Sequence, residues 1–254
     1  MSGGAAPRRL LVTRPAEDAA RIAEALGAKG IEVLIEPMLI IEDLAGPDLD
    51  LDGVQALLVT SANGARAVAR RTPVRDLPVL TVGDASARAA EAAGFTRVTS
   101  AVGDVAALAA LVRHRLDCHA GTLLHAAASE IAGDLAGILT AAGFVYRRKV
   151  LYRARTPDRL STAAAIALRD GGLGGVIFFS PRTAATFVSL INREGLAQTT
   201  AALYAYCLSP AVAEVFGGLA WKQIAIAAMP DQNSLLALID ESGWAQDRSG
   251  RQIS

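Results

Sequence analysis

The chain has 254 residues, of which 52% are apolar and 20% charged, with 25 basic and 25 acidic side chains. This balance is typical of a globular protein, and it argues against nucleic acid or an anionic membrane as the main partner. No apolar run reaches the roughly 18 residues of a membrane span and no secretory signal is visible, so we expect a cytoplasmic protein. The only cysteines, Cys118 and Cys207, lie far apart, which excludes a disulfide framework and a cysteine-cluster metal site.

Short apolar runs alternate with Ala-rich amphipathic stretches along the chain, which predicts βαβ units and parallel sheets covered by helices on both faces. The predicted strands are 10–13, 56–60, 79–82, 122–126, 176–179, 205–208 and 224–228. Segment 15–30 predicts a helix that begins at Pro15. Segment 130–143 predicts another, capped by Ser129. Its inward-facing residues would be Ile131, Leu135, Ile138 and Leu139.

The sequence also contains an internal repeat. The pattern that begins at Leu10 (strand, helix, glycine stop, strand), called A, returns at Leu123 as A′. The pattern around Thr60-Ser61, called B, returns around Phe179-Ser180 as B′. The order A, B, A′, B′ predicts two similar α/β domains, the first of them discontinuous if the chain leaves it after A and returns before B′. We predict a first domain of residues 1–36 plus 155–254, a second of 43–148, and linker strands 37–42 and 149–154.

The sequence shows none of the usual catalytic clusters. His114 and Cys118 could share a helix face and bind a metal, but a solvated basic helix end is favoured because such ligands normally come in threes or fours. His125 ends an apolar strand and is more typical of a hydrogen-bonded boundary residue than of a base. The glycines at 171–175 precede a strand, whereas a dinucleotide-binding turn follows one.

A hydroxyl side chain recurs where a predicted strand ends and a helix begins. The residues concerned are Thr13, Ser61, Ser86, Ser129, Ser180 and Ser209. Taken singly, each is adequately explained as a helix cap. Taken together, they line the sheet edges where ligands bind in open α/β folds, beside free N–H groups that favour anions. The pattern therefore favours a ligand that carries many carboxylates.

The ordered motifs of the chain resemble the uroporphyrinogen-III synthase family over about residues 8–240. They are Thr13-Arg14-Pro15, Val59-Thr60-Ser61-Ala62-Asn63, Val82-Gly83-Asp84-Ala85-Ser86-Ala87, Leu151-Tyr152, Phe178-Phe179-Ser180-Pro181 and Leu208-Ser209-Pro210-Ala211-Val212-Ala213. The resemblance implies two flavodoxin-like doubly wound domains joined by a two-stranded linker. It also implies a cyclising hydro-lyase that closes hydroxymethylbilane to uroporphyrinogen III, with loss of water and inversion of the last ring through a spiro intermediate. No cofactor and no metal are implied.

The resemblance assigns roles to individual residues. Tyr152 would face the cleft between the domains and assist departure of the hydroxyl group; the alternative is a tyrosine that only packs over the hinge. The residues expected to hold the acetate and propionate groups are Thr13, Arg14, Ser61, Asn63, Ser86, Ser129, Ser180, Arg182 and Ser209. For the two arginines the alternative is an exposed charge in a first helical turn. Many family members have a threonine where this chain has Val212, so Ser209 or backbone amides must replace it.

We expect the substrate, a linear tetrapyrrole with eight carboxylates, to bind a monomer that makes a transient contact with hydroxymethylbilane synthase. We expect no nucleic acid or membrane partner. Two other classes remain open on the residues alone. A hinge-type binding protein for a small anion has a similar architecture, but its extracytoplasmic members need a secretory signal. A nucleotide-sugar transferase would need glycine-rich turns and acidic ribose contacts after strands, and neither is found.

Overall fold

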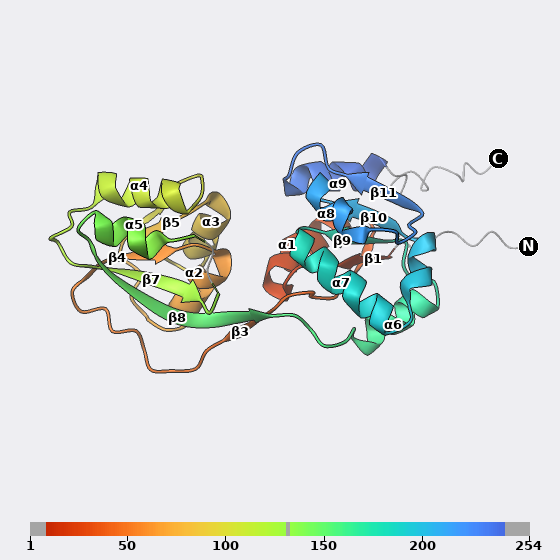
Figure 1. Ribbon diagram of the computed structural model, residues 1–254, viewed down its shortest axis with the longest axis horizontal. Helices are drawn as coiled ribbons and strands as arrows, with labels where there is room; N and C mark the ends of the chain where they lie inside the picture. The colour runs from red at the N-terminus through yellow and green to blue at the C-terminus, as the bar shows by residue number, and fades with distance from the viewer. Residues whose placement is uncertain (1–8, 131–132, 242–254) are drawn as a thin grey trace, which may run out of the picture. The chain divides into compact units, whose positions relative to one another are not determined.

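The computed structural model describes residues 9–130 and 133–241. The chain divides into two compact units (Figure 1). Unit 1 contains residues 1–40 and 156–254, and unit 2 contains residues 41–155. The chain therefore passes from one unit to the other twice, after Ile40 and after Arg155. Unit 1 is discontinuous in sequence and unit 2 is continuous.

Unit 1 has a five-stranded parallel sheet in the order β11-β10-β9-β1-β2. Its strands are β1 (Arg9–Val12), β2 (Glu32–Ile35), β9 (Gly175–Phe178), β10 (Tyr204–Cys207) and β11 (Gln223–Ile226). Its helices are α1 (Ala16–Ala28), α6 (Thr162–Arg169), α7 (Pro181–Arg193), α8 (Pro210–Ala213) and α9 (Gln232–Ile239), with 3-10 turns η1 (Ala197–Ala202) and η2 (Glu214–Phe216).

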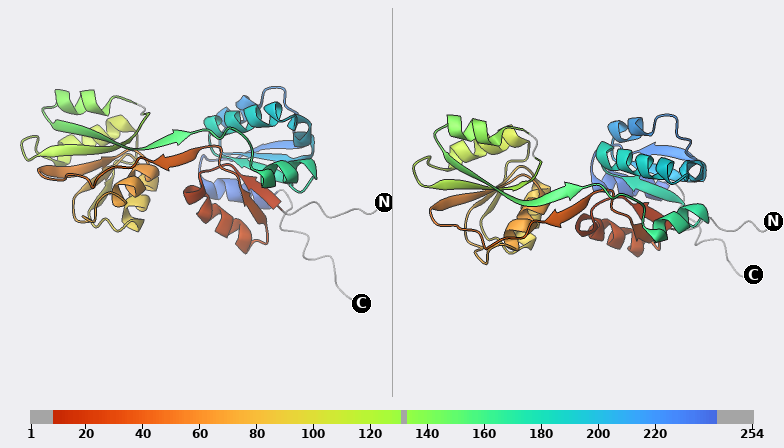
Figure 2. Two further views of the ribbon diagram at one scale, coloured as in Figure 1. Left: turned by 90° about the horizontal axis from the view of Figure 1, so that it is seen from below. Right: turned by 60° about the horizontal axis from the view of Figure 1, so that its bottom comes forward.

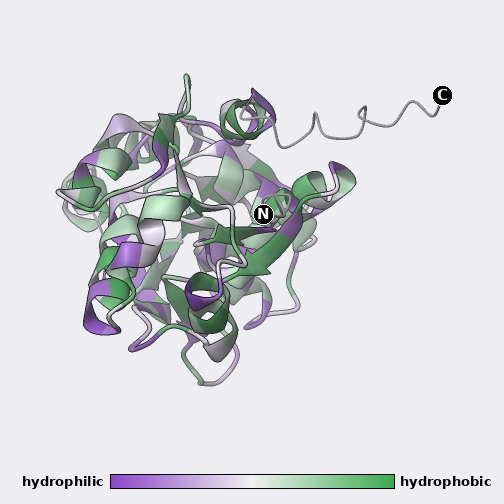
Figure 3. Cartoon of the chain, turned by 90° about the vertical axis from the view of Figure 1, so that its right-hand side faces the viewer, coloured by the Kyte–Doolittle hydropathy of each residue, from purple (hydrophilic) through white to green (hydrophobic). Residues whose placement is uncertain are grey.

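Alternate residues of β1 enter two separate cores, as the two-residue period of a strand requires. Leu11 packs with residues of α6 and α7, whereas Leu10 and Val12 pack with residues of α1 and α9. Both faces of the sheet are therefore covered by helices (Figure 1). In Figure 3 the strands are largely green and the helices carry both colours, which is the pattern of a sheet buried on both faces.

Unit 2 has a six-stranded sheet in the order β3-β8-β7-β4-β5-β6. Its strands are β3 (Ile40–Asp43), β4 (Val54–Val59), β5 (Val79–Thr81), β6 (Val98–Ser100), β7 (Thr122–Ala128) and β8 (Val145–Arg155). Helices α2 (Ala62–Ala69) and α3 (Asp84–Ala92) contribute to one core, and α4 (Val105–Arg115) and α5 (Leu135–Ala141) to the other. Strands β4 to β8 pair in parallel.

The two sheets have the same strand order once the repeat is taken into account. In unit 1, numbering the strands along the chain gives the order 2-1-3-4-5, which is flavodoxin-like. In unit 2 the same order results if β7 and β8 are counted first and β4, β5 and β6 follow. The sheet of unit 1 thus combines pattern A with pattern B′, and the sheet of unit 2 combines pattern B with pattern A′. The predicted fold class, two similar doubly wound domains with the first discontinuous, is confirmed.

The two connecting segments lie side by side. Strand β3 is the neighbour of β8 in the sheet order, and the two run in opposite directions (Figure 2). The N–H of Leu44 donates to the carbonyl of Leu151 over 2.8 Å. The Glu42 carboxylate accepts from Arg153 at 2.7 Å and also pairs with Arg155. These bonds hold the two segments together as a ribbon.

One predicted helix differs from the structure. The helix expected over 130–143 is the shorter α5, capped by the Asp134 side chain, which accepts from the Gly137 N–H at 2.8 Å. The prediction of a Ser129 cap was therefore wrong, because Asp134 offers the same capping chemistry five residues later. Leu135 and Leu139 are buried as expected, but Ile138 is 38% exposed. Ile131 lies outside the described residues.

No helix in the described part of the chain combines the length and the apolar character needed to cross a membrane.

Candidate functional site

The structure brings Tyr152 and Ser61 together at the carboxyl edge of the sheet in unit 2. Ser61 follows β4 and is the N-cap of α2. Tyr152 lies on β8 opposite Ala128, the last residue of β7, just after a shift in register between these two strands. The phenol oxygen of Tyr152 lies 2.6 Å from Oγ of Ser61. Two of the predicted site residues, 91 positions apart in sequence, thus form one hydrogen-bonded pair.

The start of α2 holds the Ser61 hydroxyl in place. Ser61 has extended backbone angles, and its Oγ accepts from the N–H of Gly64 at 3.0 Å, as an N-cap does. A Cβ at Gly64 would lie 3.1 Å from the carbonyl oxygen of Ala126, so the absence of a side chain lets α2 sit close over β7. The Ser61 oxygen therefore has two fixed neighbours, a helix amide and the Tyr152 phenol.

The Tyr152 phenol is held in its protonated form. The side chain is 5% exposed, and this burial raises the pKa of Tyr152, with the Ser61 hydrogen bond and the Arg66 charge acting in the opposite direction. A phenol whose pKa lies above its ordinary value carries its proton at neutral pH. It can therefore act as a proton donor. The Ser61 hydrogen bond and the Arg66 charge both favour the phenolate form, against the effect of burial.

Arg66 is a residue that sequence reasoning missed. It lies in α2, and its Nη2 donates to Oδ1 of Asn63 over 2.6 Å. The two residues are three positions apart, the spacing that places side chains on neighbouring positions of a helix surface. The signal available in the sequence was this three-residue spacing of Asn63 and Arg66 at the start of the helix that follows Ser61. Asn63, a predicted substrate-binding residue, is thus half-buried and engaged with this guanidinium.

The other predicted residues of unit 2 lie in different surroundings. Ser86 is buried within α3, where its N–H donates to the carbonyl of Gly83 and Gly83 is the N-cap. Ser129 is exposed after β7, and its N–H donates to the Tyr152 carbonyl over 2.9 Å. Ser129 therefore adjoins the Tyr152 backbone, whereas Ser86 is an internal helix residue.

In unit 1, the sheet edge places Ser180 in the position that Ser61 has in unit 2. Ser180 is the N-cap of α7, and its Oγ accepts from the N–H of Thr183 at 3.2 Å. The side chain of Arg182 is exposed in the first turn of the same helix. Thr13 is fully buried, and its hydroxyl donates to the carbonyl of Ile177 over 2.8 Å. Its hydroxyl thus joins β1 to the neighbouring strand.

Arg14 is packed rather than exposed, so the alternative of a solvated charge does not describe it. Its guanidinium lies 4.3 Å from the ring centroid of Phe179, and Nη1 donates to Oε1 of Gln232 over 3.4 Å. Burial lowers the pKa of Arg14, against the opposing effect of Asp18. Cation–π stacking of this kind fixes the plane of the guanidinium.

Ser209 and Val212 differ as the sequence indicated. Ser209 is the N-cap of α8, but its hydroxyl makes no capping hydrogen bond to the helix. Val212 is 1% exposed and belongs to the core of unit 1. Only Ser209 of these two therefore presents a hydroxyl at the turn after β10.

Comparison with known proteins identifies the family. The sequence model described as uroporphyrinogen-III synthase HemD matches residues 20–237. The chain belongs to this family. Membership makes it an enzyme of tetrapyrrole biosynthesis and supports synthase function over the anion-binding alternative.

Solved structures of uroporphyrinogen-III synthases also resemble the chain. The Helicobacter pylori enzyme has 17% sequence identity and a TM-score of 0.58, over 92% of this chain and 99% of that one. A mutant of the Thermus thermophilus enzyme has 15% identity and a TM-score of 0.49, over 93% and 98%. The first of these likenesses supports the fold assignment. No curated protein matches the sequence.

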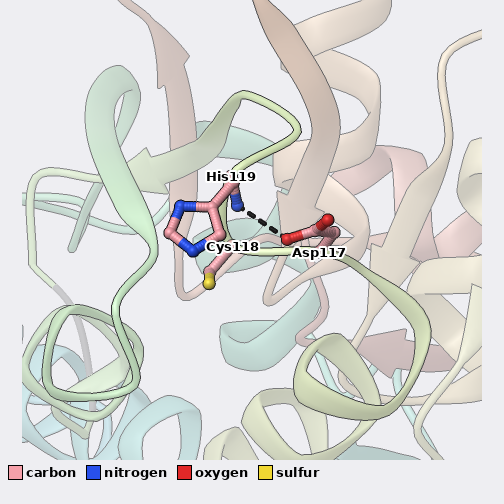
Figure 4. A group of neighbouring side chains, drawn as sticks. All are labelled: Asp117, Cys118 and His119. Carbon is pink, nitrogen blue, oxygen red and sulfur yellow. Dashed lines mark hydrogen bonds between the residues drawn. The ribbon is translucent and has the colours of Figure 1, made fainter.

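The uroporphyrinogen-III synthase resemblance implied no metal, and the described residues contain one group of three that could hold one. Asp117, Cys118 and His119 are consecutive, and their ligand atoms lie within 4.8 Å of one another (Figure 4). The N–H of His119 donates to the Asp117 carboxylate over 2.9 Å. His114, the partner considered for Cys118, instead lies in the basic last turn of α4 with Arg113 and Arg115. Three ligands from one turn fall short of the usual four-ligand structural site.

Proposed function

We propose that the chain closes hydroxymethylbilane to uroporphyrinogen III, with Tyr152 as the catalytic proton donor and Ser61 as its partner. The observation that carries this assignment is the 2.6 Å contact between the two hydroxyl groups at the carboxyl edge of the unit 2 sheet. That edge is where ligands bind in open α/β sheets. The family membership of the chain supports the reaction, and the geometry supports the choice of residues.

The first step breaks the bond between the hydroxymethyl carbon and its oxygen. The lone pair of the adjoining pyrrole nitrogen expels the hydroxyl group, and the Tyr152 phenol protonates it, so that water and an azafulvene cation form. The phenolate accepts the Ser61 hydroxyl hydrogen bond and lies near the Arg66 charge. The carbon of the cation then bonds to the substituted α-carbon of the last ring and gives the spiro intermediate. The bond from that α-carbon to the neighbouring methylene bridge breaks, and the bridge rebonds to the free α-carbon of the same ring, which inverts the ring. That carbon then releases its proton, and the ring becomes aromatic again. Over the whole reaction one hydroxyl group and one proton leave as water, which is why we classify the enzyme as a hydro-lyase.

The remaining work of the protein is to impose geometry. In spontaneous closure the cation bonds to the unsubstituted α-carbon of the last ring, and uroporphyrinogen I forms. The enzyme must therefore hold the last ring so that its substituted α-carbon is attacked instead, through a spiro intermediate. Orientation of bound reactants can supply several kcal/mol of barrier reduction, on the order of 7–11 in the best cases. No strong acid or base is needed beyond a positioned phenol.

We propose that the substrate carboxylates are held by hydroxyl groups, helix N–H groups and arginines at the two sheet edges. Ser209, Ser129 and Arg182 are the best-suited side chains, because all three are partly or fully exposed. Thr13, Arg14, Ser86 and Asn63 already contact protein groups or lie within the fold. Their roles in substrate binding stay predictions, as do the monomeric state, the cytoplasmic location and the transient contact with hydroxymethylbilane synthase.

Metal independence is a direct test of this chemistry. The pure protein is dialysed exhaustively against a chelator and then mixed with freshly prepared hydroxymethylbilane, and the uroporphyrin isomers are separated after oxidation. We expect the isomer III product to form at the undialysed rate, because no step requires a Lewis acid. Loss of activity that one divalent ion restores would contradict the mechanism. The Cys118→Ser variant would then show whether the Asp117–Cys118–His119 group holds that ion.

A further inference from the structure

A second polar cluster includes Thr60, the residue before Ser61 in the chain. His125 in β7 is 1% exposed, its Nδ1 lies 2.5 Å from the Tyr146 phenol oxygen, and its Nε2 lies 3.3 Å from Oγ1 of Thr60. Both ring nitrogens thus have a partner. Burial, with a smaller effect of Arg148, lowers the pKa of His125 to about 4. The imidazole is therefore neutral at neutral pH, with one nitrogen donating and the other accepting.

The cluster lies on the opposite face of the sheet from Tyr152. Leu123, two residues before His125, belongs to the core that includes α4 and α5. Leu124 and Ala126 on either side of His125 belong to the core that includes α2 and Tyr152. Because successive residues of a strand point to opposite faces, His125 faces α4 and α5. Thr60 contacts His125 on that face, and the next residue, Ser61, contacts Tyr152 on the other.

The turn after β4 is therefore held from both faces by hydrogen bonds to two consecutive hydroxyl residues. We infer that His125 is a positioning residue, which fixes Thr60 and thereby aims the Ser61 hydroxyl at the Tyr152 phenol. This inference rests on the proposed function, because it acts through the pair assigned to catalysis. Tyr146 completes the cluster by holding the imidazole from β8.

Packing alone does not explain a histidine at this position. The surrounding core is otherwise apolar, with Leu58, Leu80, Leu123 and Phe144 among its buried residues. A buried polar side chain costs free energy unless its hydrogen bonds are made, and a leucine would fill the space without that cost. The Arg148 charge, which acts on both His125 and Tyr146, is already engaged, since its Nη2 donates to the carbonyls of Ala128 and Ser129 at 2.7 and 2.8 Å. Two satisfied ring nitrogens rigidify the turn in a way that a leucine would not.

The test compares Thr60→Val with Thr60→Ser, each made in the wild-type protein and in Tyr152→Phe. Valine keeps the shape of threonine but cannot contact His125 through a hydroxyl, whereas serine keeps the hydroxyl. We expect Thr60→Val to lower kcat roughly three- to thirtyfold with KM nearly unchanged, the size of coupling typical of residues in one network. Thr60→Ser should keep most of the wild-type kcat. In the Tyr152→Phe background, Thr60→Val should change kcat less than about twofold, because the pair it aims no longer exists.

Three outcomes would overturn the inference. The first is an equal fold-loss from Thr60→Val in both backgrounds, and the second is no loss of kcat in the wild-type background. The third is a loss of kcat in Thr60→Ser as large as that in Thr60→Val, which would show that the hydroxyl group of residue 60 does not determine kcat. If Tyr152→Phe alone leaves closure unchanged, the proposed role of Tyr152 fails and the inference fails with it. If Tyr152→Phe slows closure but Thr60→Val does not, only the inference fails. Tyr146→Phe, which leaves His125 in place, should give a smaller kcat loss than Thr60→Val.

Discussion

At the scale of single residues, the two buried titratable groups of unit 2 are kept neutral by the same cause. Burial raises the pKa of Tyr152 and lowers that of His125, so each is uncharged at neutral pH. Their uses differ because of their partners. Tyr152 contacts a serine at the edge of the sheet, while His125 lies between two protein hydroxyls.

The depressed pKa of His125 predicts a pH-dependent stability. In the unfolded chain an ordinary histidine titrates near 6.5, so between pH 6.5 and about 4 the unfolded state binds more protons than the folded state. Stability from this group is thus complete above pH 6.5 and falls as the pH drops towards 4, by on the order of 3 kcal/mol. Urea unfolding at pH 7, 6 and 5 should show about 2 kcal/mol of this loss by pH 5 in the wild type and a smaller loss in His125→Gln. Equal losses in both proteins would assign the effect to other groups.

Residue identities at the edge were predictable from the sequence, but their contacts were not. The hydroxyls at strand ends, including Ser61, Ser180 and Ser209, follow from turn chemistry alone. The pairing of Ser61 with Tyr152 depends on the register of β8 against β7, which shifts just before Tyr152. Arg14 stacks on Phe179, 165 positions away, which no local pattern encodes.

At the scale of elements, two Ser-Pro turns of unit 1 look alike in sequence but differ in structure. Ser180 accepts a hydrogen bond from the N–H of Thr183, whereas the Ser209 hydroxyl makes no capping bond. The longer helix α7 (Pro181–Arg193) is thus capped by a side chain and the one-turn α8 is not. The same Ser-Pro pattern thus gives a capping hydroxyl in one turn and a hydroxyl that does not cap its helix in the other.

The pair provides a matched stability experiment. Ser180→Ala should lower the free energy of unfolding by about 1 kcal/mol, the usual cost of a lost N-cap. Ser209→Ala should change it by less than about 0.5 kcal/mol, as for a surface substitution that removes no bond. Both residues lie in unit 1, so denaturant unfolding followed by circular dichroism reports on the same transition. A larger loss for Ser209→Ala than for Ser180→Ala would contradict the capping assignment.

Element positions followed from the sequence wherever an apolar run met a turn signal. The seven predicted strands and the helix at 16–28 follow from such boundaries, whereas β6 (Val98–Ser100) was not predicted. The helix at 135–141 is shorter than its apolar pattern suggested, because Asp134 rather than Ser129 provides the cap. Two residues with equal capping chemistry cannot be ranked from the local sequence, and tertiary packing decides between them.

At the scale of the whole molecule, the A, B, A′, B′ repeat was the signal that carried most of the fold. It predicted two domains of equal structure, because equal patterns 113 to 119 positions apart imply equal structures. The two extended segments that flank B and A′ supplied the further indication that A shares a domain with B′. The extra edge strand β3 was not derivable as a member of the second sheet, since it belongs to a connecting segment rather than to the repeat.

The interleaved order predicts which fragments fold. A fragment of residues 41–155 contains every strand of the unit 2 sheet except the first residue of β3, so it should fold alone and melt cooperatively. A cut near residue 127 falls inside β7, an interior strand of that sheet, and also separates β1 and β2 from β9. Both halves should therefore be poorly folded by circular dichroism. Cooperative melting of both halves, without folding of the central fragment, would contradict the topology.

The central claim is that the Tyr152 phenol, paired with Ser61, drives enzymatic closure, and the isomer ratio of Tyr152→Phe tests it most directly. The ratio is measured against enzyme concentration beside a thermal melt, with Tyr204→Phe as the control, because Tyr204 belongs to the sheet of unit 1, where its ring stacks on Tyr206. A positioned proton donor contributes about 10²–10⁴-fold, and we expect the lower end because the pyrrole nitrogen already expels the hydroxyl. Tyr152→Phe should raise the uroporphyrinogen I fraction at an almost unchanged melting temperature, while Tyr204→Phe behaves like the wild type. A rate and isomer ratio for Tyr152→Phe equal to those of the wild type would contradict the account.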